Sequence, residues 1–161
     1  MNPEAPAETI KPHSPEWLPV WEIFAVGLGD VAMLVIFAAI GRTQHAVVST
    51  EGPLVGAINT AFPFVVSWLA LAAILGAFSG KAFYPMSRVA VRTLRASIPA
   101  APLGVLLRAA LQAAPTQFYA FRWDSIQLSF ILVSMLATSI LLLAWRIAWS
   151  RFRRLWWPEL P

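Results

Sequence analysis

Four long apolar stretches constrain this chain more than any other feature of its sequence. They cover residues 18–40, 54–78, 92–112 and 126–149. Each contains about 20 residues or more, and at about 1.5 Å of rise per residue such a helix crosses the hydrocarbon core of a bilayer, which is about 30 Å thick. A buried helix of a soluble domain is seldom so uniformly apolar. The sequence therefore predicts an all-α polytopic membrane protein, a bundle of four transmembrane helices with short loops.

The composition supports the same class. Of the 161 residues, 58% are hydrophobic and only 12% are charged, which leaves too little polar surface to cover a soluble domain of this size. We interpret the net charge of +4 as a topology signal and an attraction to anionic lipid, and not as a nucleic-acid-binding surface. The absence of cysteine excludes disulfides, iron–sulfur ligation and cysteine nucleophiles.

Basic residues are unequally divided between the two sides of the predicted bundle. Arg42 and Arg122 would lie on one side. The other side would carry Lys11, Lys81, Arg88, Arg92, Arg95, Arg146, Arg151, Arg153 and Arg154. Because Lys and Arg are enriched on the cytoplasmic side of membrane proteins, we expect both termini in the cytoplasm. The first 16 residues lack the basic start, short apolar run and cleavage site of a secretory signal, so we expect the first apolar stretch to be retained as a helix.

Tryptophan residues gather near the predicted ends of the spans. Indole rings favour the headgroup level of a bilayer, so we interpret these residues as interface anchors. The anchors are Trp17, Trp21, Trp145, Trp149, Trp156 and Trp157 on the cytoplasmic side and Trp123 on the other side. Trp68 differs, because it falls in the middle of the second stretch, where its N–H needs a partner. We divide the chain into a cytoplasmic tail (1–16), a transmembrane domain (17–149) and a basic, Trp-rich cytoplasmic tail (150–161).

Two groups of arginines flank the third and fourth spans. They consist of Arg88, Arg92 and Arg95, which share one stripe of a helix, and of Arg151, Arg153 and Arg154. The simplest interpretation is anchoring, with long side chains reaching from the span to the interface. The alternative for the first group is a site for an anionic lipid or a phosphate. In both cases we expect these arginines to contact anionic headgroups.

One carboxylate lies near the middle of the first span. A charge at the depth of Asp30 costs at least about 2.5–3.5 kcal/mol, so this residue must face protein, pair with a cation or be protonated. We expect Arg108 of the third span to be its partner, because helical side chains lean toward the helix N-terminus. Asn59 is placed in the same layer as Arg108. The sequence therefore predicts a buried polar lock of Asp30, Asn59 and Arg108, and the alternative is a proton or cation site at Asp30.

Other polar residues and prolines recur inside the spans. Pro99 and Pro102 are expected to break the third helix twice. Polar side chains form stripes on the second and fourth helices, at Asn59, Ser67, Gln127, Ser134 and Thr138. Hydrogen bonds between helices account for these stripes, and a path for a small molecule is the alternative.

Several chemistries are excluded by residue type. His13 and His45 lie outside the spans, so no intramembrane imidazole is available to hold a haem iron or a bacteriochlorophyll magnesium. The sequence also lacks a phosphate-binding loop, a serine nucleophile elbow and a His-Glu-x-x-His motif. Arg42, His45 and Glu51 are too loosely spaced for a metal site and are interpreted as a solvated loop. We therefore expect no cofactor, no metal and no enzymatic activity.

Several short runs resemble a known family. They are Gly29-Asp30, Ile40-Gly41-Arg42 with His45, Gly52-Pro53-Leu54, Ala61-Phe62-Pro63-Phe64 with Trp68, and Pro102-Leu103-Gly104 with Arg108. In this order and spacing they resemble the small bacterial, archaeal and plastid-containing-lineage membrane proteins of domain of unknown function family 3054, over about residues 27–149. The resemblance implies a four-helix protein of the prokaryotic cytoplasmic (inner) membrane with no established activity.

Two functional hypotheses follow. The first is an accessory or assembly subunit that packs against a larger membrane complex, for instance a respiratory or photosynthetic one. The second is a small transporter that acts as a homodimer, with Asp30 as a proton or cation site. A membrane enzyme acting on lipid is a third possibility, but neither a nucleophile nor a metal site is visible in the sequence. We expect membrane lipids as partners in every case, and no nucleic acid.

Overall fold

The computed structural model describes residues 18–44, 52–83, 85–113 and 127–156. These residues form four α-helices and one short 3-10 helix. In chain order they are α1 (Val20–Gln44), α2 (Pro53–Ile74), η1 (Gly80–Ala82), α3 (Met86–Ala113) and α4 (Leu128–Trp156). All four α-helices are long and apolar enough to cross a membrane. The prediction of an all-α bundle of four transmembrane helices is confirmed.

The helix bounds differ from the predicted spans at several ends. α2 ends at Ile74, short of residue 78, while α3 begins at Met86, before residue 92. α4 continues to Trp156, so its last two turns occupy part of the segment that was predicted to be a tail. A hydropathy profile marks only the apolar part of a helix. The helix itself can continue into the membrane interface where its residues favour helical structure. The predicted N-terminal tail, 1–16, lies outside the described residues.

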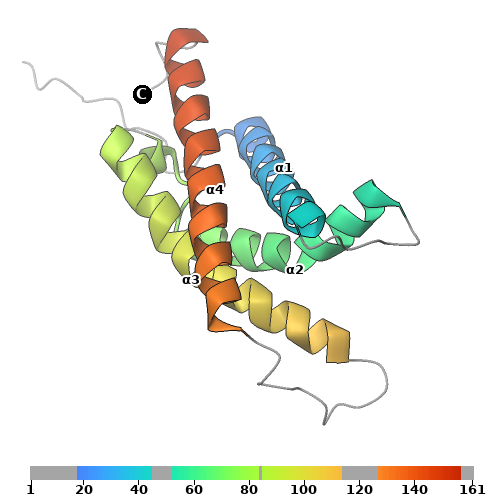
Figure 1. Ribbon diagram of the computed structural model, residues 1–161. Helices are drawn as coiled ribbons and strands as arrows, with labels where there is room; N and C mark the ends of the chain where they lie inside the picture. The colour runs from blue at the N-terminus through green and yellow to red at the C-terminus, as the bar shows by residue number, and fades with distance from the viewer. Residues whose placement is uncertain (1–17, 45–51, 84, 114–126, 157–161) are drawn as a thin grey trace, which may run out of the picture.

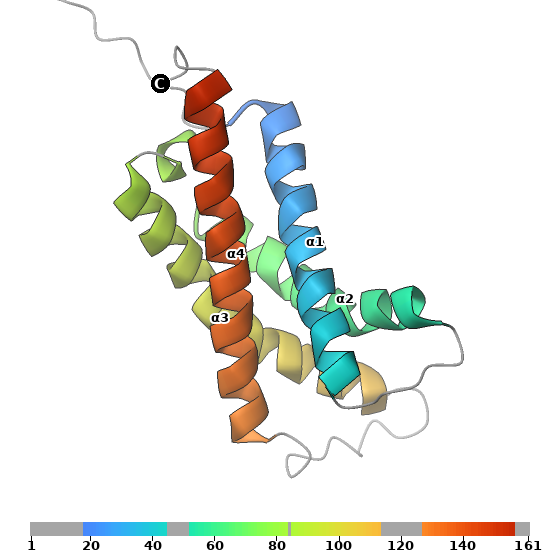
Figure 2. The same cartoon turned by 45° about the horizontal axis from the view of Figure 1, so that its top comes forward.

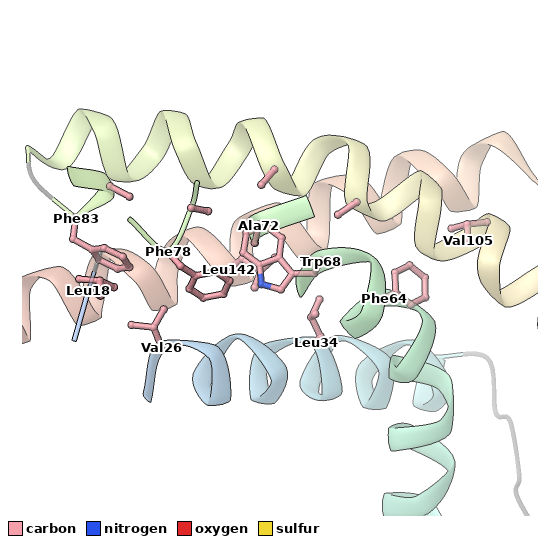
Figure 3. Close-up of a cluster of buried hydrophobic side chains, with 14 residues drawn as sticks. Leu18, Val26, Leu34, Phe64, Trp68, Ala72, Phe78, Phe83, Val105 and Leu142 are labelled. Carbon is pink, nitrogen blue, oxygen red and sulfur yellow. The ribbon is translucent and has the colours of Figure 1, made fainter. Parts of the chain in front are cut away.

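α1 and α4 lie side by side and run antiparallel, so that α1 begins at the end of the bundle where α4 ends (Figures 1 and 2). α2 crosses behind this pair in both views, and α3 packs along the other side of α4. Figure 3 shows the apolar core between the helices, with Val26 and Leu34 on α1, Trp68 on α2 and Leu142 on α4. The core is therefore built from all the long helices.

The buried side of α1 is a single row of residues spaced by four. Its members are Glu22, Val26, Asp30, Leu34 and Ala38. α4 has a matching row at Ser134, Thr138, Leu142, Arg146 and Ser150. Rows of this spacing form the ridges by which helices interlock. The opposite face of α1 exposes large apolar side chains, such as Phe24 and Leu28, which suits contact with lipid. The α1 row brings two carboxylates into the core, at Glu22 and Asp30, and the α4 row brings one cation, Arg146.

Prolines bend two of the helices but do not interrupt them. α3 is continuous through Pro99 and Pro102, so the prediction that it is broken twice is wrong. It changes direction about midway instead (Figures 1 and 2), because a proline removes one backbone hydrogen bond and crowds the preceding turn. α2 contains Pro63 and turns beside Phe64 (Figure 3).

Candidate functional site

Asp30 lies at the centre of a buried ion pair. Its Oδ1 accepts a hydrogen bond from Nε of Arg146 at 3.1 Å, and its Oδ2 accepts one from Nη2 of the same guanidinium at 2.7 Å. The indole N–H of Trp68 donates to Oδ2 at 3.0 Å. The side chains of Arg146 and Asp30 are 1% and 0% exposed, so three charge-assisted hydrogen bonds replace water at the carboxylate. We call Asp30, Trp68 and Arg146 the ion-pair centre.

The helix register explains why these residues meet. Asp30 lies ten residues after Val20, the start of α1, and Arg146 lies ten residues before Trp156, the end of α4. Because the two helices are antiparallel, the residues reach the same depth. The long side chain of Arg146 also leans toward the N-terminus of α4, as helical side chains do, and so reaches toward the middle of the bundle. Sequence positions and side-chain direction therefore place the guanidinium against the carboxylate.

Aromatic rings and a turn complete the surroundings of Arg146. Its Cζ lies 5.0 Å from the ring centroid of Trp68, 4.9 Å from that of Phe78 and 5.7 Å from that of Phe83. Its Nη1 donates to the backbone carbonyl of Ala77 at 2.6 Å. These contacts combine cation–π attraction with a charge-assisted hydrogen bond, so the guanidinium is enclosed on several sides.

The turn that supplies Ala77 depends on a glycine. Gly76, two residues after the end of α2, has a φ of 67°, in the left-handed region that favours glycine. The N–H of Ala77 then bonds to the carbonyl of Ala72 at 2.8 Å, which is the Schellman pattern of a helix C-terminus. Arg92 of α3 fixes the turn from the other side, because its Nη1 donates to the carbonyl of Gly76 at 2.9 Å and to Oγ of Ser79 at 2.6 Å.

A second ion pair lies two turns away on the same helices. Oε1 of Glu22 is 3.0 Å from Nε of Arg153 and accepts a hydrogen bond from the indole N–H of Trp149 at 3.2 Å. Glu22 is 0% exposed and the Arg153 side chain is 12% exposed. Between the two pairs, Nε1 of Trp145 donates to the carbonyl of Val26 at 3.1 Å. Two ion pairs and two indole N–H groups thus join α1 to α4.

The predicted pairing of Asp30 with Arg108 is wrong. Arg42, three turns further along α1, donates from Nη1 to Oγ1 of Thr60 at 3.3 Å. Arg108 lies near this level, because the close contact of Gly104 with Phe64 puts it beside the turn of α2 that holds Thr60. By helical rise this level is roughly 18 Å from Asp30 along α1. The prediction chose the wrong arginine because Arg146 was assigned to the membrane boundary.

The other members of the predicted lock lie away from the ion-pair centre. Arg108 is half-buried, with its Cζ 5.9 Å from the ring centroid of Phe130. Asn59 is exposed on α2. We call Arg42, Thr60 and Arg108 the arginine end of the bundle. Asp30 is thus the only member of the predicted lock that lies in the ion-pair centre.

The position of the chain among known families can now be given. A family model described as "Protein of unknown function (DUF3054)" matches residues 27–149. The chain belongs to this family. The resemblance found in the sequence is confirmed, and neither the curated proteins nor the solved structures contain a match to this chain. Asp30, Trp68 and Arg146 all lie within the segment that the DUF3054 model covers, whereas Glu22 and Arg153 lie outside it.

The six arginines predicted to contact anionic lipid fall into two groups. Four are exposed, namely Arg88, Arg95, Arg151 and Arg154. Arg92 and Arg153 are instead occupied by the turn after α2 and by Glu22. Arg154 also approaches Sδ of Met86 at 3.8 Å, so the basic ends of α3 and α4 lie together. Contact of the exposed four with lipid stays a prediction.

The predicted interface anchors also differ in their surroundings. Trp21 and Trp156 are 49% and 68% exposed, as an anchor requires. Trp145 and Trp149 are half-buried, and their N–H groups are used between helices. Trp145 and Trp149 begin a row of tilted rings along α4 that continues through Phe152 to Trp156, with neighbouring centroids 5.7–5.8 Å apart. Trp17, Trp123 and Trp157 lie outside the described residues, as do His45 and Glu51.

The polar stripes predicted to join helices do so in part. Oγ of Ser97 on α3 and Oγ of Ser139 on α4 share a hydrogen bond of 2.8 Å. Oγ1 of Thr138 donates to the carbonyl of Ser134 within α4 at 2.7 Å, and the hydroxyls of Ser67 and Ser134 are buried without a hydrogen-bond partner in the described part of the chain. No group of three or more potential metal-ligating side chains lies together among the described residues. The absence of a metal, a cofactor or an activity stays a prediction.

Proposed function

We propose that this protein is a non-catalytic accessory or assembly subunit that packs against a larger membrane complex. The observation that supports this most is the state of Asp30, the carboxylate deepest in the bundle. Both of its oxygens accept hydrogen bonds, two from Arg146 and one from Trp68. A carboxylate bound in this way holds helices together, and protonation of either oxygen would weaken its ion pair with Arg146. We therefore assign the function to contacts made by the outer surface of the bundle.

The outer surface is suited to contacts within a bilayer. Large apolar side chains are exposed on three faces, represented by Leu28 on α1, Val91 on α3 and Leu136 on α4, which are 72%, 62% and 63% exposed. Such apolar faces can be covered by lipid tails or by another membrane protein. We propose that one face is covered by a partner subunit, in a respiratory or photosynthetic complex of a prokaryotic cytoplasmic membrane. The basic excess beside Met86 and Trp156 supports cytoplasmic termini.

Site-specific photo-cross-linking combined with purification tests this proposal. A photoreactive residue is placed at Leu28, Val91 or Leu136 in the full chain, which is then purified from its native membranes in a mild detergent. We expect one face to cross-link a defined membrane protein that also co-purifies in stoichiometric amount. Leu142, which is 1% exposed, is the matched control and should give no intermolecular product. Recovery of the chain without another protein, and with lipid adducts alone from every face, would overturn the proposal.

The second candidate is a dimeric transporter that uses Asp30 as a proton or cation site. The observation in its favour is a fully buried carboxylate within a membrane-spanning helix. In each transport cycle, the proton or cation would have to displace Arg146 from the carboxylate of Asp30. Proteoliposomes that hold a pH-sensitive dye distinguish the two candidates. The subunit proposal expects no proton flux that depends on Asp30, and flux that is lost in Asp30→Asn while the variant stays folded would favour the transporter.

A further inference from the structure

The second ion pair, between Glu22 and Arg153, contains two buried polar atoms that the described residues leave without a hydrogen bond. They are Oε2 of Glu22 and Nε of Arg153. This Nε lies 3.0 Å from Oε1 of Glu22, which is close enough for an ion pair, but its N–H does not make a hydrogen bond to that oxygen. A buried donor or acceptor without a partner carries the full cost of its desolvation, so both atoms need one.

Two neighbouring donors on α4 are already in use. The indole N–H of Trp149 donates to Oε1 of Glu22 at 3.2 Å, and the hydroxyl of Ser150 donates to the carbonyl of Arg146 at 2.8 Å. In the ion-pair centre, by contrast, Nε of Arg146 and both oxygens of Asp30 take part in hydrogen bonds. The same combination of a carboxylate, a guanidinium and an indole is therefore complete at one level of the bundle and incomplete at the other.

The two atoms have opposite polarity, which restricts what can bind to both of them. A proton on Oε2 would replace an acceptor without a donor by a donor without an acceptor, and it would leave Nε of Arg153 unchanged. A cation would meet Oε2 but would be repelled by the guanidinium, and an anion would meet Nε but would be repelled by the carboxylate of Glu22. A small neutral molecule that both donates and accepts hydrogen bonds fits both atoms.

We propose that the second ion pair binds a water molecule, which accepts a hydrogen bond from Nε of Arg153 and donates one to Oε2 of Glu22. Buried waters typically make about three hydrogen bonds to otherwise unpaired polar groups. Water can reach the site, because Glu22 lies roughly 3 Å by helical rise from the start of α1 and the side chain of Arg153 is 12% exposed. Glu22 itself is 0% exposed, so this water is enclosed by the protein. The site is independent of the proposed subunit role.

The same contacts define where hydration between α1 and α4 ends. Val26, the next residue of the buried row of α1, is 0% exposed, and its carbonyl accepts the indole N–H of Trp145. The ring of Trp145 lies directly against Gly29. The ion-pair centre follows, with its carboxylate already bonded on both oxygens. We therefore expect a hydrated ion pair near the helix ends and a dry one in the middle of the bundle.

Nuclear magnetic resonance of the full chain in detergent micelles tests the site. Arginine and tryptophan are isotope-labelled, and cross-relaxation between water and their side-chain N–H protons is measured. We expect the Nε proton of Arg153 and the indole proton of Trp149 to show cross-peaks to water with the sign of a long-lived bound molecule. The matched controls are the same two groups of the ion-pair centre, in Arg146 and Trp68, which should show none. Arg153→Lys and Trp149→Phe assign the signals, because each removes one of them.

Each outcome decides a separate point. Visible signals of Arg153 and Trp149 without a water cross-peak would overturn the site. Cross-peaks with the sign of fast surface water, or loss of both signals through exchange with solvent, would also overturn it, because the pair would then be open to solvent. Equal cross-peaks at Arg146 and Trp68 would keep the bound water but overturn the dry inner pair. Unchanged control signals show that the two variants fold, and if Trp149→Phe does not fold, the Nε signal of Arg153 alone decides.

Discussion

The ion-pair centre and the arginine end deal with charge inside the bundle in opposite ways. In the ion-pair centre, Arg146 lies 2.7 Å from Asp30 and is almost fully buried. At the arginine end, Arg108 is half-buried with its Cζ 5.9 Å from the ring centroid of Phe130, and it has no carboxylate partner among the described residues. The comparison shows that one arginine within the spans is neutralised by a carboxylate of another helix, whereas a second arginine packs against an aromatic ring. We therefore expect Arg146 to contribute more to the stability of the fold than Arg108 does.

The largest effect is expected from Arg146→Leu. This change leaves the carboxylate of Asp30 buried without a cation, and breaking a buried pair in this way costs about 3–5 kcal/mol. Unfolding of the purified protein by denaturing detergent, followed by circular dichroism, measures the loss. The matched control is Arg108→Leu, the same chemical change at the arginine end, which should shift the free energy of unfolding by less than about 1 kcal/mol. Equal losses in the two variants would remove the distinction between the two regions.

Gly29→Ala should produce the next largest loss. A Cβ at this position would overlap the ring of Trp145, so the ring would have to move and give up its hydrogen bond to Val26. Overpacking of this kind costs about 1–3 kcal/mol. Gly27→Ala, on the same helix with no atom within 4 Å of the new Cβ, should be neutral or stabilising. A Gly29→Ala protein as stable as Gly27→Ala would show that Trp145 does not pack against α1.

Glu22→Gln should have a smaller effect on stability than Arg146→Leu or Gly29→Ala. The glutamine can still accept the hydrogen bond from Trp149, but the ion pair with Arg153 is lost. Arg153 is already 12% exposed, so its released side chain can reach water, and the expected loss is about 1–2 kcal/mol. Unfolding at several salt concentrations checks the assignment, because the loss should shrink as salt rises. A loss as large as that of Arg146→Leu would place both ion pairs in the same class.

The smallest effect is expected for the hydroxyl groups. Ser97→Ala removes the 2.8 Å hydrogen bond to Ser139, and interhelical bonds of this kind are worth about 0.6 kcal/mol in a membrane protein. Ser67→Ala removes a buried hydroxyl that has no hydrogen-bond partner among the described residues, so it should be neutral or stabilising. The same unfolding assay compares the two. A larger loss in Ser67→Ala would indicate a partner for its hydroxyl that the structure does not assign.

The sequence predicted the fold class and one half of the ion-pair centre. Long apolar stretches indicate membrane helices because the bilayer core excludes polar groups that have no partner. For the same reason, the polar groups of Asp30 and Trp68 were predicted to need partners inside the bundle. Both needs are met by the same contact, since the indole N–H of Trp68 donates to Asp30. The family was also recognised, from polar residues spaced within the spans.

The identity of the cation could not be read from hydropathy. With the fourth span ending at residue 149, Arg146 counted as an interface residue, but α4 continues to Trp156 and carries Arg146 into the bundle. The end of an amphipathic last turn depends on tertiary contacts such as that of Arg153 with Glu22, which hydropathy does not contain. A register argument would have found the pair, because Glu22 and Asp30 match Arg153 and Arg146 in antiparallel order. The turn that brings Ala77, Phe78 and Phe83 to the guanidinium likewise gave no local signal.

A double-mutant cycle on Asp30 and Arg146 tests the account most directly. Asp30→Asn, Arg146→Gln and the double variant are compared with wild type by the free energy of unfolding in the same detergent. Each single change should leave a buried charge unpaired, while the double variant leaves none, so we predict a coupling energy of about 2–3 kcal/mol. Additive losses, with a coupling energy below about 0.5 kcal/mol, would contradict the claim that this pair holds the helices together.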